Sequence, residues 1–367
     1  MASCRHQMLV NPKKSDDPDN DGDLESSYDF QSLEEAIRQA DILIEEERLL
    51  EAARILNSID IECLLDDHKN IISKAEDILE FLEDINSTID VDDQRSSQDF
   101  NENVENSSYI NRWVEQKIDC GKRPGNIFYK LNSDGVLTLK VETPIEKSLL
   151  IPLLSVLNES ELYPSWIPSW TIPHFSITRS IKLQQRGRAS QTLLLTCEVP
   201  WPLLTREVVI SADAVDDIEG PSEAIIVRLK TLTHTEDNKE IVPPPESEKI
   251  CRISFTGGFT FKKPEKSDKD EDHDVEESFI ISSFLARIDS KLLSFPKPLL
   301  DFVLKHAFGL VWKKLLSVAE EVRDGKRPLH QKVIESKRAS LYDWVDERVN
   351  RMLQLNQRRT VTNNDQL

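Results

Sequence analysis

The residues that most often carry catalysis or bind metals are scattered along this chain of 367 residues. Its seven histidines show no metal-ligand spacing, and the sequence contains no HExxH, no G-x-S-x-G and no phosphate-binding loop. One charged pair, Glu198 and Arg206, remains as a candidate for acid–base chemistry at the ends of two expected strands. We therefore expect a protein that is not an enzyme and that holds no cofactor and no metal ion.

The clearest pattern is a helix expected over 297–322 that has an unusually wide apolar face. Its polar residues fall on a single line at steps of four: Asp301, Lys305, Lys313 and Ser317. Most of the other positions are apolar, and a face this wide covers more than one neighbouring helix. A long helix laid into the concave face of an antiparallel sheet would account for it.

The residues that precede this helix predict such a sheet. Short helices are expected over 109–117 and 144–157, and the turn Asn132–Gly135 joins the first two strands. Gly257 and Gly258 predict a bulge within a strand. Strand-like runs cover 126–131, 136–142, 171–183, 191–199, 207–214, 223–232, 250–262 and 278–288.

Three stretches carry a more specific pattern. Residues 153–168 read LLSVLNESELYPSWIP, residues 197–212 read CEVPWPLLTREVVISA, and 279–309 runs through a strand, an Asp, a Pro and the apolar helix. In this order they resemble a START domain, the steroidogenic-acute-regulatory-related lipid-transfer domain, over roughly 109–322. The resemblance implies an α+β helix-grip fold, in which a curved antiparallel sheet and a long C-terminal helix enclose a cavity. Glu207 departs from it, because the family usually has Asp there.

The resemblance also implies a function, which is to bind and transfer or sense one lipid, a sterol or a phospholipid, inside that cavity. Burying a lipid chain contributes about 0.8 kcal/mol per CH₂, and the C-terminal helix must move to admit it. Arg206 has a second interpretation as a structural ion-pair residue, and the helix residues have one as ordinary core. The residues expected to line the cavity or its gate are Trp166, Leu194, Trp201, Arg206, Leu300, Val303, Leu304, Ala307, Phe308 and Val311.

Two segments suggest transient contact with a membrane surface. The proline-rich stretches 163–170 and 200–202 hold three tryptophans, whose amphipathic rings suit a membrane interface or, alternatively, the ends of the sheet. The tail 323–367 has ten basic and six acidic residues and predicts a basic amphipathic helix. That helix is expected to lie on an anionic membrane, to pack against the domain or to coil with a partner.

Residues 30–87 predict a small helical bundle or hairpin that resembles a tetratricopeptide-like pair. One such unit does not form a binding groove alone, because these repeats are stable as stacks of three or more. The alternative function follows from this segment: an adaptor that recruits a protein partner through its N-terminal helices and uses the START-like domain as an interaction module.

The remaining expectations follow from charge and composition. The net charge of −20 excludes a general nucleic-acid binder. No run of apolar residues is long enough to span a bilayer, no secretory signal is visible, and the five cysteines are scattered, which predicts reduced thiols and a cytoplasmic protein, peripheral at membranes. Acidic residues concentrate in 1–29 and in the linker 88–108, both expected to be disordered, and in a loop over 264–277.

Overall fold

The computed structural model describes residues 22–89, 111–120, 123–171, 174–201, 203–235, 238–264, 279–289 and 302–364. Nearly all of the expected linker 88–108 and of the acidic loop 264–277 lies outside these residues. Within the described part, three cysteines are free thiols, as expected, whereas Cys63 is disulfide-bonded and departs from that expectation.

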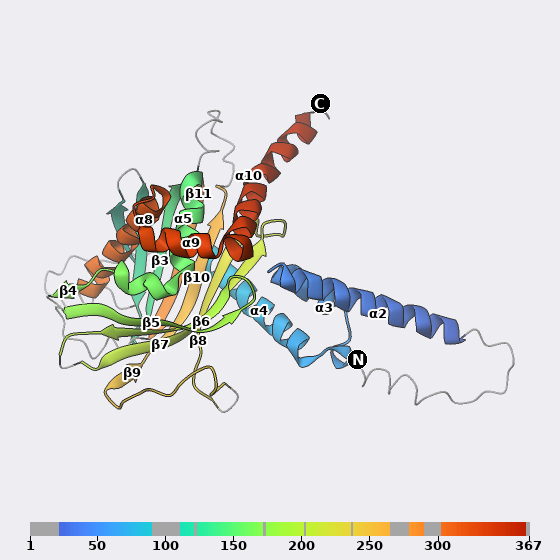
Figure 1. Cartoon of the computed structure of the whole chain (residues 1–367), viewed down its shortest axis with the longest axis horizontal. Helices are drawn as coiled ribbons and strands as arrows, with labels where there is room; N and C mark the ends of the chain where they lie inside the picture. Colours follow the sequence, from blue (N-terminus) through green and yellow to red (C-terminus); the bar gives the residue numbers. More distant parts are fainter. Residues whose placement is uncertain are drawn as a thin grey trace, which may run out of the picture.

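A single sheet of eleven strands organises the described residues (Figure 1). Its order is β1-β2-β3-β11-β10-β8-β7-β6-β5-β4, all neighbours being antiparallel, and β9 pairs in parallel with β7. The strand bounds are β1 Val114–Asp119, β2 Pro124–Leu131, β3 Leu137–Glu146, β4 Trp170–Thr171, β5 His174–Arg186, β6 Ser190–Glu198, β7 Thr205–Asp217, β8 Ala224–Thr231, β9 Ile250–Arg252, β10 Ser254–Lys262 and β11 Phe279–Asp289.

Two local expectations about this sheet are wrong and one is confirmed. Where a helix was expected over 109–117, strand β1 pairs with β2 from Val114 onward. Gly257 and Gly258 lie in unbroken register with β11 and form no bulge. A Cβ at Gly258 would lie 2.9 Å from the ring of Phe81, so this glycine lets an N-terminal helix approach the sheet closely. Gly135 closes the β2–β3 hairpin at φ 85° as expected.

One face of the sheet is covered by helices that lie between β3 and β4 in the chain and by the helices that follow β11. The main hydrophobic core joins inward-facing residues of β2, β3 and β10 to the helices α5, α8 and α10, whose bounds are given below. Trp312 anchors α8, because its indole nitrogen donates to Thr143 Oγ1 at 3.0 Å. The helix bounds on this side are α5 Lys147–Asn158, η3 Ser160–Ser165, the π-helical turn η5 Val303–Ala307, α8 Phe308–Arg323, α9 Pro328–Ser336, the π-helical turn η6 Arg338–Tyr342 and α10 Asp343–Asn364.

The N-terminal helices cover part of the opposite face. They are α2 Gly22–Glu45, α3 Leu49–Leu56, η1 Ile61–Cys63 and α4 Asp66–Asn86. Ile78 and Phe81 of α4 pack in one cluster with Ile226 and Leu285 of the sheet. The fold is therefore the α+β arrangement expected, with the additional finding that the N-terminal helices pack directly onto the sheet.

Ion pairs and backbone contacts fix these helices in place. Asp77 of α4 pairs with Arg228 and with Lys230, each at 2.7 Å. The turn between α2 and α3 inserts the buried Glu47 carboxylate between strands, where it accepts from the amide of Arg188 at 2.6 Å. Burial raises the pKa of Glu47. The helices α3 and α4 are therefore part of the same folded body as the sheet.

Candidate functional site

A cavity of about 260 Å³ lies between the sheet and the beginning of the C-terminal helix; we call it the proximal cavity. Strands β5, β6 and β7 form one wall, and η5 with the first turn of α8 forms the other. Its lining is almost wholly apolar and consists of Leu137, Trp170, His174, Phe175, Ile177, Leu195, Cys197, Val199, Pro200, Arg206, Val208, Ile253, Ile288, Phe302, Val303, Ala307, Phe308 and Val311.

The few polar groups of the proximal cavity gather at one end. Cys197 and Arg206 are paired residues of β6 and β7, and both line the cavity. Burial raises the pKa of the Cys197 thiol to about 12, although the nearby Arg206 acts in the opposite direction. The thiol therefore stays protonated at neutral pH. Arg206 is 6% exposed and donates to the carbonyl oxygen of Leu204 at 2.7 Å.

Aromatic rings hold the cavity's helical wall against the sheet. Trp170 of β4 packs against Phe302 with ring centroids 5.6 Å apart in an edge-to-face arrangement, and Phe175 of β5 lies 4.9 Å from Trp170. Deeper in the core, the ring centroids of Trp312 and Phe259 lie 6.3 Å apart. The first turn of the helix is thus held by side-chain packing, while its later turns are anchored by Trp312.

Half of the residues expected at the site line this cavity. Arg206 does so from the sheet, and Val303, Ala307, Phe308 and Val311 do so from the helix. Leu300 lies outside the described residues, as does the side chain of Leu304.

Three expected residues lie elsewhere. Leu194 is 3% exposed but packs with Val209 and Val242 in a separate cluster, whereas its neighbours on β6 line cavities. Trp166 is buried in the main core, edge-on to Tyr163 at 5.7 Å. Trp201 is 92% exposed in the loop between β6 and β7. None of the three contributes to the cavity wall.

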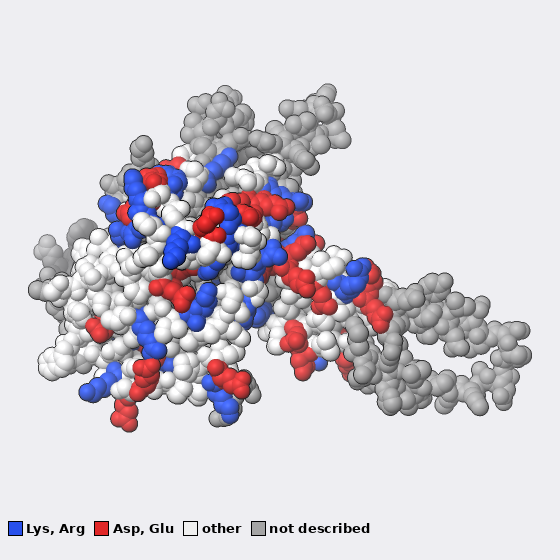
Figure 2. All heavy atoms as spheres, viewed as in Figure 1, with Lys and Arg blue, Asp and Glu red and all other residues white. Residues whose placement is uncertain are grey.

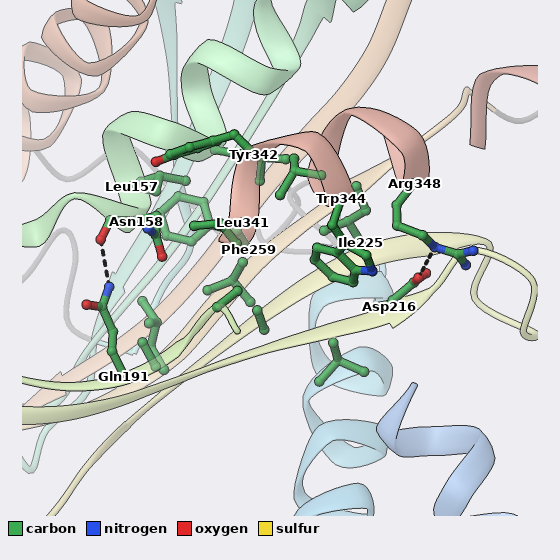
Figure 3. Close-up of a pocket in the computed structure, with 18 of the residues that line it drawn as sticks. Leu157, Asn158, Gln191, Asp216, Ile225, Phe259, Leu341, Tyr342, Trp344 and Arg348 are labelled. Carbon is green, nitrogen blue, oxygen red and sulfur yellow. Dashed lines mark hydrogen bonds and ion pairs between the residues drawn. The ribbon is translucent and has the colours of Figure 1, made fainter. Parts of the chain in front are cut away.

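A second cavity, which sequence reasoning missed, has a volume of about 110 Å³; we call it the distal cavity (Figure 3). Sheet residues of β6, β7, β8 and β10 form its floor, and α5 forms one side. Leu341, Tyr342, Trp344 and Val345 line it from the C-terminal helices. The only signal in the sequence was the apolar stripe of the tail, which does not reveal what the stripe contacts.

The basic tail therefore packs against the domain, which is one of the three placements expected for it. Val349 and Met352 of α10 are buried in the main core. Arg348 pairs with Asp216 of β7, both groups being largely buried (Figure 3). Arg351, which is half-exposed, pairs with Glu219 in the β7–β8 hairpin.

A buried carboxylate holds the segment that leads to α10. Glu159, at the end of α5, accepts a hydrogen bond from the hydroxyl of Tyr342 at 2.7 Å and forms an ion pair with Lys337 at 2.5 Å. Burial, reinforced by the Glu159 charge, raises the pKa of Tyr342. Tyr342 therefore remains a neutral donor to Glu159 at neutral pH.

No group of side chains suited to a metal ion occurs within the described residues. No helix in the same part of the chain is long and apolar enough to cross a membrane.

No protein-family model and no curated protein matches the sequence. Among solved structures, human STARD10 is 12% identical, with a TM-score of 0.43 over 71% of this chain and 89% of that chain. The lipid transfer and protein localization domain of human StarD13 is 13% identical, with a TM-score of 0.38 over 56% and 88%. A STAR-related lipid transfer protein from Xanthomonas axonopodis is 18% identical, with a TM-score of 0.38 over 57% and 98%. The chain is thus similar to START domains, and its sheet and helices have the expected α+β helix-grip arrangement.

Proposed function

We propose that the protein binds one lipid in the proximal cavity and carries it between membranes or senses it. The observation that supports this most directly is the cavity itself. It measures about 260 Å³, its lining is almost entirely apolar, and η5 with the first turn of α8 forms one wall. An apolar cavity of roughly 150 Å³ already holds benzene. This one therefore has room for a larger part of an apolar ligand, and its few polar groups stand where a head group would be oriented.

The gate in this proposal is the segment from Phe302 to Val311. It begins with the π-helical turn Val303–Ala307, a form that often occurs at functional sites because it breaks the regular hydrogen-bond ladder. Its contacts with the sheet are apolar packing contacts around Trp170 and Phe175. Moving this turn exposes the cavity and leaves the Trp312 anchor in place.

Membrane contact is proposed for the end of the body that carries the β6–β7 loop. Pro200 lines the cavity, and beyond it Trp201 and Leu204 are exposed by 92% and 45%. Figure 2 shows few charged side chains at the end of the body where β4 lies, whereas the N-terminal helices are mostly acidic. An exposed tryptophan on an uncharged surface suits insertion into the interfacial region of a bilayer.

The test compares two adjacent residues of α8. Val311 lines the cavity, whereas Leu310 is 43% exposed and does not. We expect organic extracts of the purified wild-type protein and of Leu310→Trp to contain about one lipid per protein by mass spectrometry. We expect Val311→Trp, which fills the cavity, to lose at least about tenfold of that lipid. Extracts without lipid from a folded wild-type protein, or equal lipid in both variants, would contradict the proposal.

The adaptor alternative needs a free apolar groove on the N-terminal helices. Most apolar residues of α3 and α4 pack on each other and on the sheet. Ile61, Leu65 and Leu79 are at least half-exposed, but the structure describes no apolar groove that joins them. Recruitment of a partner through 30–87 therefore remains a prediction.

A further inference from the structure

Helix α9 is attached to the rest of the body through a histidine. Of its nine residues only His330 is fully buried, at 1% exposed, whereas the adjacent Leu329 is 61% exposed. Ile334 packs against the main core but is only partly buried. Neither ring nitrogen of His330 has a hydrogen-bond partner within the described residues, so the ring is stable there only while it is neutral. The docking of α9 therefore depends on a group that titrates close to neutral pH.

The charges that act on His330 disfavour a proton on its ring. Burial lowers the pKa of His330, Arg327 lowers it further, and Glu159 acts in the opposite direction. Arg327 stands directly before α9 and pairs with Glu321 of α8 at 2.6 Å, which holds its positive charge at the start of the helix. A protonated ring would therefore be buried near a fixed cation.

The carboxylate of Glu159 is already engaged by other groups. One of its oxygens accepts from the hydroxyl of Tyr342 at 2.7 Å, and the other pairs with Lys337 at 2.5 Å. Lys182 of β5 interacts electrostatically with both Lys337 and Glu159. Because these cations balance its charge, Glu159 has little capacity left to stabilise a proton on His330.

The segment 326–342, which contains α9 and η6, lies between two helices that are anchored separately. The indole of Trp312 holds α8, and the buried pair of Arg348 and Asp216 holds α10. Gly325 has φ 71° and stands in open space, with no described neighbour within 4 Å of the position of a Cβ. At the other end, the π-helical turn η6 interrupts the regular helix. The chain can therefore bend at both ends of the segment while α8 and α10 stay in place.

We propose that residues 326–342 form a strap that mild acidity releases from the body, and that its release opens the distal cavity. Leu341 and Tyr342, at the end of the strap, line that cavity (Figure 3). In the open strap the ring of His330 is hydrated and takes up a proton with an ordinary pKa of about 6.5. Because the open form binds the proton more tightly than the closed form, acidification shifts the equilibrium toward it. This inference does not rest on the lipid-binding function proposed above.

Hydrogen–deuterium exchange of the purified full-length protein at pH 7.5 and pH 5.5 tests the release. Rates are corrected for the pH dependence of chemical exchange. In the wild type we expect exchange in 328–342 to rise by about fivefold or more, with an upper limit of about tenfold for each pH unit below 6.5. Exchange in α8 and in 343–354 is expected to change by less than about twofold, because their anchors do not titrate in this range.

Two adjacent residues of α9 provide the variant and its control. His330→Leu keeps an apolar side chain in the buried position and removes the titrating group, so its exchange in 328–342 should change by less than about twofold between the two pH values. Leu329→Ala alters an exposed neighbour and should respond as the wild type does.

Opening of the distal cavity is measured by the fluorescence of the apolar dye ANS, which reports exposed apolar surface. We expect the fluorescence of the wild type to rise between pH 7.5 and pH 5.5. Ala212→Leu, which fills the distal cavity, should at least halve this rise while exchange in the strap still increases. An equal rise in Ala212→Leu would contradict the opening of this cavity.

The exchange results decide the strap itself. A wild type without a rise in 328–342 overturns the proposal, whether or not His330→Leu folds. The same rise in a folded His330→Leu, or an equal rise throughout α8 and 343–354, also overturns it. Lipid extraction tests the proposed function separately, so either proposal can fail while the other stands.

Discussion

At the scale of single residues, the protonation of His330 of α9 is tied to the fold. Its side chain is buried, and neither ring nitrogen has a hydrogen-bond partner within the described residues. Burial lowers the pKa of His330, the neighbouring Arg327 lowers it further, and Glu159 acts in the opposite direction. The folded protein therefore keeps this ring neutral under conditions in which the unfolded chain protonates it.

This arrangement predicts how stability depends on acidity. The pKa of His330 is lower in the folded protein than in the unfolded chain, where it is about 6.5. The stability that the neutral ring contributes is therefore fully present above that pKa and is lost as the pH falls. Between about pH 7 and pH 5 the free energy of unfolding should fall by up to about 1.4 kcal/mol per pH unit from this group alone. Urea denaturation across that range measures it. His330→Gln should flatten the dependence. An unflattened His330→Gln profile would show that another group is responsible.

At the scale of elements, helix α10 depends on one buried ion pair more than on its exposed charges. Arg348 and Asp216 have side chains 14% and 4% exposed, whereas Arg351 is 54% exposed. Removing one partner of a buried pair leaves the other uncompensated and costs about 3 kcal/mol, while an exposed pair contributes less than about 1 kcal/mol. Arg348→Ala should therefore speed amide hydrogen exchange in α10 strongly and Arg351→Ala only weakly. Similar exchange in the two variants would mean that apolar packing alone seats the helix.

The elements also show what the sequence could and could not predict. The wide apolar face of the helix expected over 297–322 predicted a helix over the sheet, because only a broad surface accommodates such a face. The run Leu193–Leu195 is apolar on both faces of β6, so alternation could not decide which side chains face inward, and Leu194 faces the wrong way for the cavity. The stripe of α10 is compatible with a membrane and with a sheet, and only long-range packing decides between them.

At the scale of the whole molecule, the N-terminal helices are acidic, and some of their acidic side chains form the ion pairs that hold them to the sheet. Asp77 and Asp84 pair with Arg228, Lys230 and Arg287 of the sheet. Deleting these helices would expose the apolar cluster beneath them, so deletion is a poor test of what their charge does. The exposed acidic residues around η1 make no contact that holds the helices to the sheet, so substituting them is a better test of that charge.

The proposed membrane contact lies at the end of the sheet that carries the β6–β7 loop, and the acidic helices pack near the opposite hairpins. Repulsion from an anionic bilayer should therefore act only when screening is weak, at about 0.01 M salt, where the Debye length reaches about 30 Å. Neutralising Glu62, Asp66 and Asp67 as Gln, Asn and Asn should then raise flotation with anionic vesicles by about twofold. The effect should vanish near 1 M salt, where the Debye length is about 3 Å. The charge-conserving swaps Glu62→Asp, Asp66→Glu and Asp67→Glu should bind as the wild type does. If the neutralised protein floats no better at low salt, the acidic helices do not restrain membrane contact.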